Sequence, residues 1–468
     1  MIPAPLVLVG GPLVIASVVY LVRRLSAIAA LLSASTALAV AWLAGSVPTS
    51  AGASTLSGWV AGGPWVVLGR TLEVTSGVQA PLIAISLVTA VLLLLAVRLQ
   101  PGGIFFPGLL AWLGVAAAVL VTQTFTFRVL LVEVAVGLTT MLLQGTRFGS
   151  TRGAWRFFLF STMAMPLLLV ASWQIDFQTA NPAQVELLDP AVLLLTLGFT
   201  IYLSAAPFHL WMAPAATEAE TVSQVVALSL FPMLTLSVIV QAFERYPWFA
   251  SSTTPYQWFT FVGILTAALG TVLAFHARNF GRISSYSLMV DTGAVLLLLG
   301  TATQLGLICA WALLLSRAVS LVVWAAGLCV IRRRTQSDQV DTATSVGWDL
   351  RLATAVLVLG GLSLAGFPLT PGFAARWMAL GLLARAQPST ALLLLLGTAS
   401  SAAGVLYAAR VLLALGPHSA EPAPAERWQW VNTVALLLVI AGAVLLSLYP
   451  NPLLSAAAGT SGTATYFP

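Results

Sequence analysis

Apolar runs of the length of a membrane-spanning helix recur along almost the whole chain. A helix needs about 20 apolar residues to cross a bilayer. Fourteen such runs lie near 5–22, 26–44, 78–98, 104–122, 129–145, 156–173, 191–213, 221–241, 256–276, 284–300, 304–331, 350–384, 388–414 and 429–449. Only 7% of the residues are charged, against about a quarter in soluble domains. The pattern predicts an all-α polytopic membrane protein of about fourteen transmembrane helices.

The arginines are distributed unevenly between alternate loops. One set of loops holds most of them, whereas the other set holds Arg70, Arg128 and Arg245. Cytoplasmic loops are enriched in basic residues, so we expect both termini to lie outside. The expected location is a prokaryotic cell (inner) membrane. The first basic pair, Arg23 and Arg24, follows the first apolar run, which is the reverse of a cleavable signal. The formal charge of +6 comes from arginines in short loops between spans, where topology explains them. We therefore expect no nucleic-acid partner.

All twenty basic residues are arginine, and the chain has no lysine. A buried lysine can lose its proton at accessible pH, whereas an arginine effectively cannot. Four ionisable residues fall well inside apolar runs: Glu133, Asp291, Arg317 and Arg376. Charges in a membrane are costly and usually functional, so these four are candidates for ion movement. Static pairs that hold helices together are the alternative.

Prolines interrupt two of the apolar runs. Pro207 interrupts the seventh, and Pro368 and Pro371 interrupt the twelfth. Broken helices are tolerated in a membrane where protein or water satisfies the freed backbone. The breaks lie five spans apart, and this odd offset gives the two copies opposite orientations, as in inverted-repeat transporters.

The offset predicts two inverted five-helix repeats, spans 4–8 and 9–13. We expect four regions: residues 1–100 with spans 1–3 and an external loop at 45–77; 101–245 with the first repeat; 250–415 with the second; and 416–468. The last contains a cytoplasmic connection, span 14 and an external tail that is loosely ordered from about residue 455. Segments 335–349 and 416–428 are expected to be polar cytoplasmic connections, and a short hairpin is expected around Trp65–Arg70.

Four stretches together resemble a known family. They are Phe127 to Glu133, Ala206 to Trp211 with Val222-Ser223 after it, Asn279 to Ser287, and Ser363 to Phe373. In this order and at these spans they resemble the antiporter-like membrane subunits of respiratory complex I (NADH:quinone oxidoreductase, chains of the L, M and N type). Mrp-type cation/proton antiporters and membrane-bound hydrogenases contain related subunits. The resemblance covers roughly spans 4 to 13.

The resemblance implies proton transfer along a central polar axis, with a span-5 glutamate paired to a span-7 lysine. Glu133 matches the glutamate, but Tyr202 occupies the lysine position. Ser320 occupies a second usual lysine position, and Arg376 a third, on span 12. Asp291 lies where relatives often have glutamine or histidine. The candidate proton pathway comprises Glu133, Tyr202, His209, Asp291, Arg317, Ser320 and Arg376.

Two functional hypotheses remain open. The first is a membrane-arm subunit of a complex I-like assembly, which either moves protons by a changed route or, without lysines, acts as a degenerate scaffold. The second is the membrane subunit of an inorganic-carbon uptake complex with a soluble zinc partner, or an Mrp-type cation/proton antiporter subunit. An unrelated solute carrier is a third and weaker hypothesis.

The chain has no sequence signature for redox chemistry of its own. Cys309 and Cys329 form no CxxC or Cys/His cluster, and no dinucleotide-binding fingerprint is present, so we expect neither a cluster nor a structural zinc site. In a respiratory assembly, flavin, iron–sulfur clusters and quinone would belong to partner subunits. The expected partners are other membrane subunits, the lipid bilayer, and a soluble redox arm or a soluble zinc protein.

Overall fold

Almost every residue of the computed structural model that can be placed lies in or next to a helix. The structure describes residues 2–47, 60–61, 63–67, 69–99, 104–144, 151–181, 185–414 and 429–461. Residues 48–59 of the expected external loop, the connection expected at 416–428 and the tail beyond 461 lie outside the described residues.

The elements in chain order are β1 (Ile2–Pro3), α1 (Ala4–Leu21), α2 (Ser26–Ser46), β2 (Val60–Ala61), β3 (Trp65–Val67), β4 (Arg70–Leu72), α3 (Ser76–Leu99), α4 (Phe105–Val121), α5 (Phe125–Leu143), α6 (Arg152–Thr162), α7 (Ala164–Ala180), η2 (Val185–Leu187), α8 (Leu188–Tyr202), η3 (Phe208–Trp211), α9 (Met212–Glu218), α10 (Thr221–Val225), η4 (Val226–Leu230), α11 (Phe231–Arg245), α12 (Pro247–Ser251), α13 (Thr254–Phe275), α14 (Phe280–Gly300), α15 (Gln304–Thr335), η5 (Asp341–Ala343), α16 (Val346–Asp349), α17 (Arg351–Leu364), α18 (Phe373–Ala386), α19 (Pro388–Leu412), α20 (Gln429–Leu448) and α21 (Asn451–Ser461).

Ten helices of the described chain are long and apolar enough to cross a membrane, or eleven if the bent pair α20–α21 counts as one span. Continuous pairs such as α6–α7 and α10–α11 count once in that number. Shorter apolar helices, α4, α8 and α17, fall on further runs of the sequence. The chain is therefore a nearly all-helical, multi-pass protein, and the count of fourteen stays a prediction.

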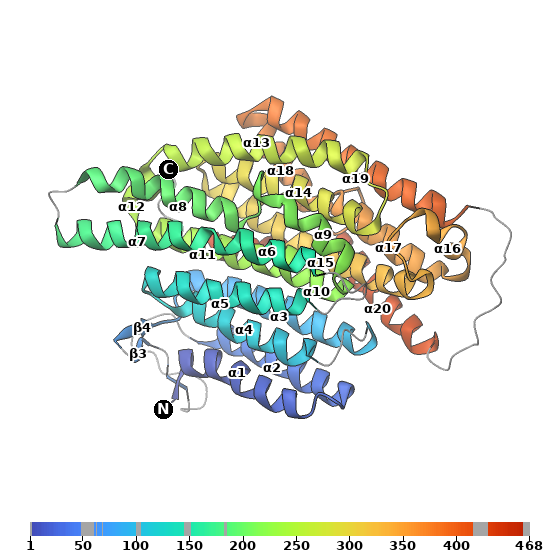
Figure 1. Cartoon of the computed structure of the whole chain (residues 1–468), viewed down its shortest axis with the longest axis horizontal. Coiled ribbons are helices and arrows are strands. Elements are labelled where there is room, and N and C mark those ends of the chain that lie inside the picture. Colours follow the sequence, from blue (N-terminus) through green and yellow to red (C-terminus); the bar gives the residue numbers. More distant parts are fainter. Residues whose placement is uncertain are drawn as a thin grey trace.

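The helices run roughly parallel in one elongated bundle (Figure 1). The N-terminal helices α1–α4 lie along one long edge, and α13 and α19 lie together along the other. Segment α10–α11 is enclosed on all sides, and α15 is almost as deeply buried. The outer helices instead expose large apolar side chains such as Trp42, Trp173 and Phe261. Apolar patches of this kind mark contact with lipid or another protein.

The helices are interrupted where the prolines lie. Helix α8 ends at Tyr202, five residues before Pro207, and the chain resumes as η3 and α9. Helix α17 ends at Leu364, and α18 begins only at Phe373, after Pro368 and Pro371. A third irregularity has no proline signal within it: η4 is a π-helical turn between α10 and α11. Such turns are rare and occur often at functional sites.

The structure tests two smaller expectations, the hairpin and the C-terminal tail. The expected hairpin is present, with Trp65 opposite Leu72 and Val67 opposite Arg70. The expectation of loose order from about residue 455 is wrong as far as Ser461, because α21 continues as a helix to that residue. Its small side chains allow close packing on α15 and α3, and Ala457 is completely buried.

Candidate functional site

Two charges inside the second half of the bundle form an ion pair. Arg376, in the first turn of α18, donates from Nη2 to Oδ1 of Asp291 on α14. The same nitrogen donates to the carbonyl of Leu364, the last residue of α17. Both side chains are almost completely buried. The pair therefore ties α14 to both ends of the broken span.

A second arginine lies beside this pair. Arg317 on α15 is buried and donates from Nη1 to the hydroxyl of Thr292, at 3.0 Å. It lies close enough to Asp291 and Arg376 for their charges to act on it. Two arginines and one aspartate give this cluster, which we call the arginine cluster, a net formal charge of +1. The sequence left open which arginine pairs with Asp291, and the structure assigns the direct contact to Arg376.

The break between α17 and α18 is held by hydroxyl groups. Ser320 on α15 and Ser363 on α17 share a hydrogen bond of 2.6 Å between their hydroxyls. The backbone N–H of Gly372 donates to the same Ser363 hydroxyl, at 2.9 Å. Gly366 adopts a left-handed φ of 72°, and a Cβ there would lie 2.8 Å from the Arg376 side chain. Glycine allows both the turn and the close approach of the guanidinium stem.

The first half of the bundle has an acid without a cation. Glu133 on α5 is half-buried and accepts a hydrogen bond of 2.5 Å from Thr162, at the end of α6. Its other oxygen has no hydrogen-bond partner among the described residues. Tyr202, at the end of α8, is buried within range of the Glu133 charge and packs edge-on against Phe231. Structure and sequence therefore agree that no arginine or lysine neutralises Glu133 within the described chain.

His209 lies apart from both groups. It is on η3 and lines a cavity of about 530 Å³ with Arg152 and Arg156 from α6 and Arg282 and Tyr286 from α14. Its Nδ1 atom makes no hydrogen bond to a described residue. The seven candidate residues thus fall into three places: Glu133 with Tyr202, the arginine cluster with Ser320, and His209 in this cavity.

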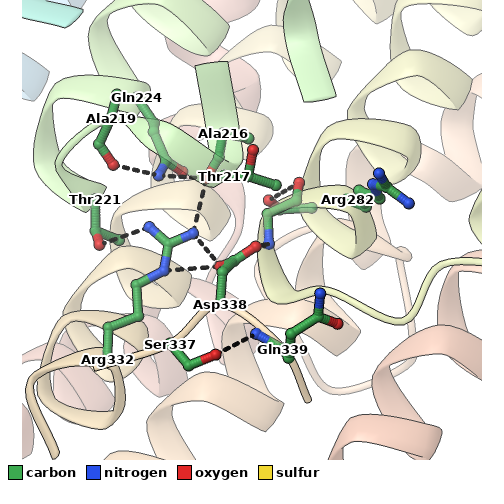
Figure 2. Close-up of polar contacts among 12 residues, drawn as sticks. Ala216, Thr217, Ala219, Thr221, Gln224, Arg282, Arg332, Ser337, Asp338 and Gln339 are labelled. Atoms are coloured by element: carbon green, nitrogen blue, oxygen red, sulfur yellow. Dashed lines mark hydrogen bonds and ion pairs between the residues drawn. The ribbon is translucent and has the colours of Figure 1, made fainter. Parts of the chain in front are cut away.

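A buried ion pair at one end of the bundle was not singled out from the sequence (Figure 2). Arg332, near the end of α15, contacts Asp338 through Nε at 2.9 Å and also through Nη2. It donates to the Ala216 carbonyl at 2.8 Å and to the Thr221 hydroxyl at 3.2 Å. Asp338 in turn accepts from the backbone N–H of Gly281, at the start of α14. We call this group the Arg332 latch.

The latch joins four elements that are far apart in the chain: α9, α10, α14 and α15. Burial raises the pKa of the Asp338 carboxyl above its ordinary value, and the neighbouring Arg332 charge opposes that rise. A buried arginine with this many acceptors is well satisfied. No sequence feature indicated this pair, because Arg332 stands in a run of three arginines that topology alone explains.

The sequence also did not indicate three hydroxyl residues that contact the candidate residues: Thr162, Thr292 and Ser363. Hydroxyl residues are frequent in apolar helices, where they bond their own backbone carbonyls, and nothing local marks the ones that reach another helix. Within the described ranges, no group of three or more His, Cys, Asp or Glu side chains could hold a metal ion.

Comparisons with known proteins identify the family and the fold. The family model described as "NADH:quinone oxidoreductase/Mrp antiporter, TM" matches residues 147–403, which is more than half of the chain. NADH-quinone oxidoreductase subunit N of Ectopseudomonas mendocina (strain ymp) is 28% identical over 319 residues, covering 63% of this chain and 61% of that relative. Subunit N 2 of Acidobacterium capsulatum is 27% identical over 380 residues, covering 75% and 76%. The chain thus spans less than two thirds of the first of these relatives.

Solved structures share the fold over nearly the whole chain. A chain of the membrane-bound sulfane sulfur reductase, an archaeal respiratory membrane complex, superposes with a TM-score of 0.81, at 16% identity and 98% and 97% coverage. A chain of the Mrp complex from Dietzia sp. DQ12-45-1b superposes with a TM-score of 0.77, at 16% identity, covering 99% of this chain and 98% of that chain. A chain of respiratory complex I from Thermus thermophilus superposes with a TM-score of 0.76, at 18% identity, covering 98% of each chain. The broken helices, the buried charges and the family match lead to one conclusion: this chain is an antiporter-like membrane subunit of the NADH:quinone oxidoreductase/Mrp antiporter family.

Proposed function

We propose that this chain is a membrane-arm subunit of a complex I-like NADH:quinone oxidoreductase in a prokaryotic cell membrane. The names of the relatives in sequence support this, since they are NADH-quinone oxidoreductase N subunits. Electron transfer belongs, in this proposal, to partner subunits that carry flavin, iron–sulfur clusters and quinone. This chain either moves protons across the membrane or serves as a scaffold for neighbouring subunits.

The proposal includes fourteen spans, with two inverted five-helix repeats over spans 4–8 and 9–13 and both termini outside. The breaks after α8 and after α17 fall in the fourth span of each five-span repeat, and a further helix follows each break. Glu133 and Asp291 lie on the second span of their repeats, α5 and α14. The acids of the two halves are therefore equivalent in position and differ in their partners.

This difference decides which half exchanges protons. Asp291 is neutralised by Arg376, with Arg317 beside it, and arginine does not release its proton in a protein. Glu133 has a hydroxyl partner and no cation in the described chain. A carboxyl that can alternate between neutral and charged forms is what proton transfer needs. We therefore place proton exchange at Glu133 in the first half and assign the arginine cluster a structural role.

The contrast between Glu133, which has no cation partner among the described residues, and Asp291, which is paired with Arg376, is the observation that carries the proposal. The experiment that tests the assembly is purification of the tagged chain from its native membrane in mild detergent, followed by mass spectrometry of the co-purifying proteins. Flavin and iron–sulfur subunits would support a complex I-like arm. A soluble zinc protein would assign the chain to inorganic-carbon uptake instead, and a set of small antiporter subunits would assign it to cation/proton exchange.

A further inference from the structure

The cavity that contains His209 is lined by three exposed arginines. Arg152 and Arg156 come from the first two turns of α6, and Arg282 comes from the first turn of α14. The structure shows no hydrogen bond or ion pair between these guanidinium groups and any described side chain. One carboxylate, Glu218, shares the cavity, and it already accepts a hydrogen bond of 2.9 Å from the Gly153 N–H. The cavity therefore has an excess of positive charge.

The walls of this cavity are fixed by close packing. A Cβ atom at Gly281, the residue before Arg282, would lie 2.5 Å from the Ala216 carbonyl, so α14 and α9 touch backbone to backbone. The Arg332 latch holds the same two helices from the other side, and Figure 2 shows the Arg282 side chain extending away from Asp338. Because α9 and α14 are fixed relative to each other, the backbone that carries Arg282 does not have to move when a ligand arrives, which lowers the cost of binding.

One side of the cavity continues into an apolar outer surface. Leu210 and Leu273 line the cavity, and Leu210 is 53% exposed. Val272 and Phe275, next to Leu273 on α13, are 60% and 57% exposed. A ligand that fits must therefore carry negative charge at one end and an apolar part that lies against α13. Basic pockets between membrane helices bind anionic lipid headgroups in this way.

We propose that this cavity binds the phosphodiester headgroup of an anionic phospholipid, with Arg152, Arg156 and Arg282 around the phosphate and an acyl chain along α13. Arginine suits phosphate because its planar group donates two parallel hydrogen bonds. Tyr286, on the same face of the cavity, supplies a neutral hydroxyl for the headgroup. The site would anchor α6 to α14, and so connect helices of the first and second halves at one end of the bundle.

The test uses the full chain, alone or with the subunits that co-purify, in a neutral detergent. Native mass spectrometry measures the binding of dihexanoyl phosphatidylglycerol, with dihexanoyl phosphatidylcholine and inorganic phosphate as the comparison ligands. The variant Arg152→Gln/Arg156→Gln/Arg282→Gln should bind phosphatidylglycerol at least about tenfold more weakly, since each arginine near an anionic lipid contributes to binding. The matched control is Arg24→Gln/Arg385→Gln/Arg410→Gln, which removes three exposed arginines elsewhere and should bind as the wild type does.

Several results would overturn the proposal. They are equal phosphatidylglycerol affinity in the wild type and the cavity variant, equal affinity of the wild type for phosphatidylcholine, or inorganic phosphate that binds as tightly as the lipid. Loss of a neighbouring subunit with lipid binding intact would show that a protein acid occupies the cavity. If the triple variant does not fold, the single variant Arg282→Gln replaces it and should weaken phosphatidylglycerol binding severalfold, with Arg385→Gln unchanged.

Discussion

Asp291 and Arg376 are 85 residues apart in the chain, yet the guanidinium of Arg376 donates directly to the Asp291 carboxylate. The contact crosses from α14 to the helix that follows the second break. Both charges lie away from bulk solvent, because both side chains are almost completely buried. A buried pair of this kind adds little net stability compared with apolar packing, but removal of one partner leaves an uncompensated charge. Arg317 lies beside the pair, so a substitution at any of the three residues changes the net charge of the whole arginine cluster.

Asp291→Asn should therefore be the most destabilising single change in the arginine cluster. It leaves Arg317 and Arg376 both charged with no acid between them, and we expect a loss of about 3–5 kcal/mol. Arg376→Gln should cost less, because Asp291 then faces Arg317. The double variant Asp291→Asn/Arg376→Gln restores a net charge of +1 and should melt at a higher temperature than Asp291→Asn. Thermal unfolding in mild detergent measures all three.

The exposed acid Asp349 provides the control for this series. Asp349→Asn should melt within a few degrees of the wild type, since surface substitutions rarely change stability by more than about 0.5 kcal/mol. A double variant no more stable than Asp291→Asn would mean that the two charges do not compensate each other. An exchange of the two charges, Asp291→Arg with Arg376→Asp, should likewise recover stability over either single reversal.

Asp291 and Arg376 could be selected from the sequence because a charge inside an apolar run is conspicuous. The helix breaks at Pro207 and at Pro368 were equally visible, since proline cannot continue the backbone ladder of a helix. The partner of Asp291 could not be selected. Arg317 and Arg376 both lie in later spans, and the spacing along the chain does not reveal which helix faces which.

The hydroxyl contacts and the Arg332 latch lay beyond sequence reasoning for a different reason. Ser287 and Ser363 look alike in sequence, but Ser287 bonds the carbonyl four residues before it, whereas Ser363 reaches α15 and the Gly372 N–H. Arg332 looks like its neighbours Arg333 and Arg334, but it alone of the three is completely buried. In each case the difference arises from tertiary packing, which has no local pattern.

Ser363→Ala should destabilise the break between α17 and α18. The substitution leaves the buried N–H of Gly372 without its acceptor, and an unsatisfied buried donor costs about 1–3 kcal/mol. Ser287→Ala is the matched control, because its hydroxyl bonds only the carbonyl of its own helix. Melting temperatures should fall for the first variant and stay near the wild type for the second. Equal melting temperatures would mean that the Ser363 hydroxyl does not support the break.

Arg332→Gln should loosen one end of the bundle. It removes the cation opposite buried Asp338 and two further hydrogen bonds, to Ala216 and to Thr221, and the loss of one partner from a buried pair costs about 3–5 kcal/mol. We expect faster hydrogen exchange at the start of α14 and protease cleavage within 336–345. Arg334→Gln, two residues on and exposed, should show neither change. Hydrogen exchange in α14 of Arg332→Gln that is as slow as in the wild type would contradict the role given to the latch.

Glu133→Gln should lower the proton yield of the assembled complex while electron transfer continues. Glutamine keeps an oxygen that can accept from Thr162, so we expect the stability to change by no more than about 1 kcal/mol, but it cannot carry a proton as a carboxyl does. The measurement is the number of protons moved per NADH oxidised by the purified complex in proteoliposomes. Glu186→Gln, the same change at an exposed position, should pump as the wild type does.

The outcome of the Glu133 substitution separates the two roles that the lysine-free sequence allows. The arginine cluster cannot take over proton release, because its cations keep their protons, so a pumping subunit must depend on the first half. A lower proton yield in Glu133→Gln, with normal NADH oxidation and a normal melting temperature, would establish that dependence. An unchanged yield in a correctly assembled complex would mean that this chain moves no protons and that its broken helices serve as a scaffold for neighbouring subunits.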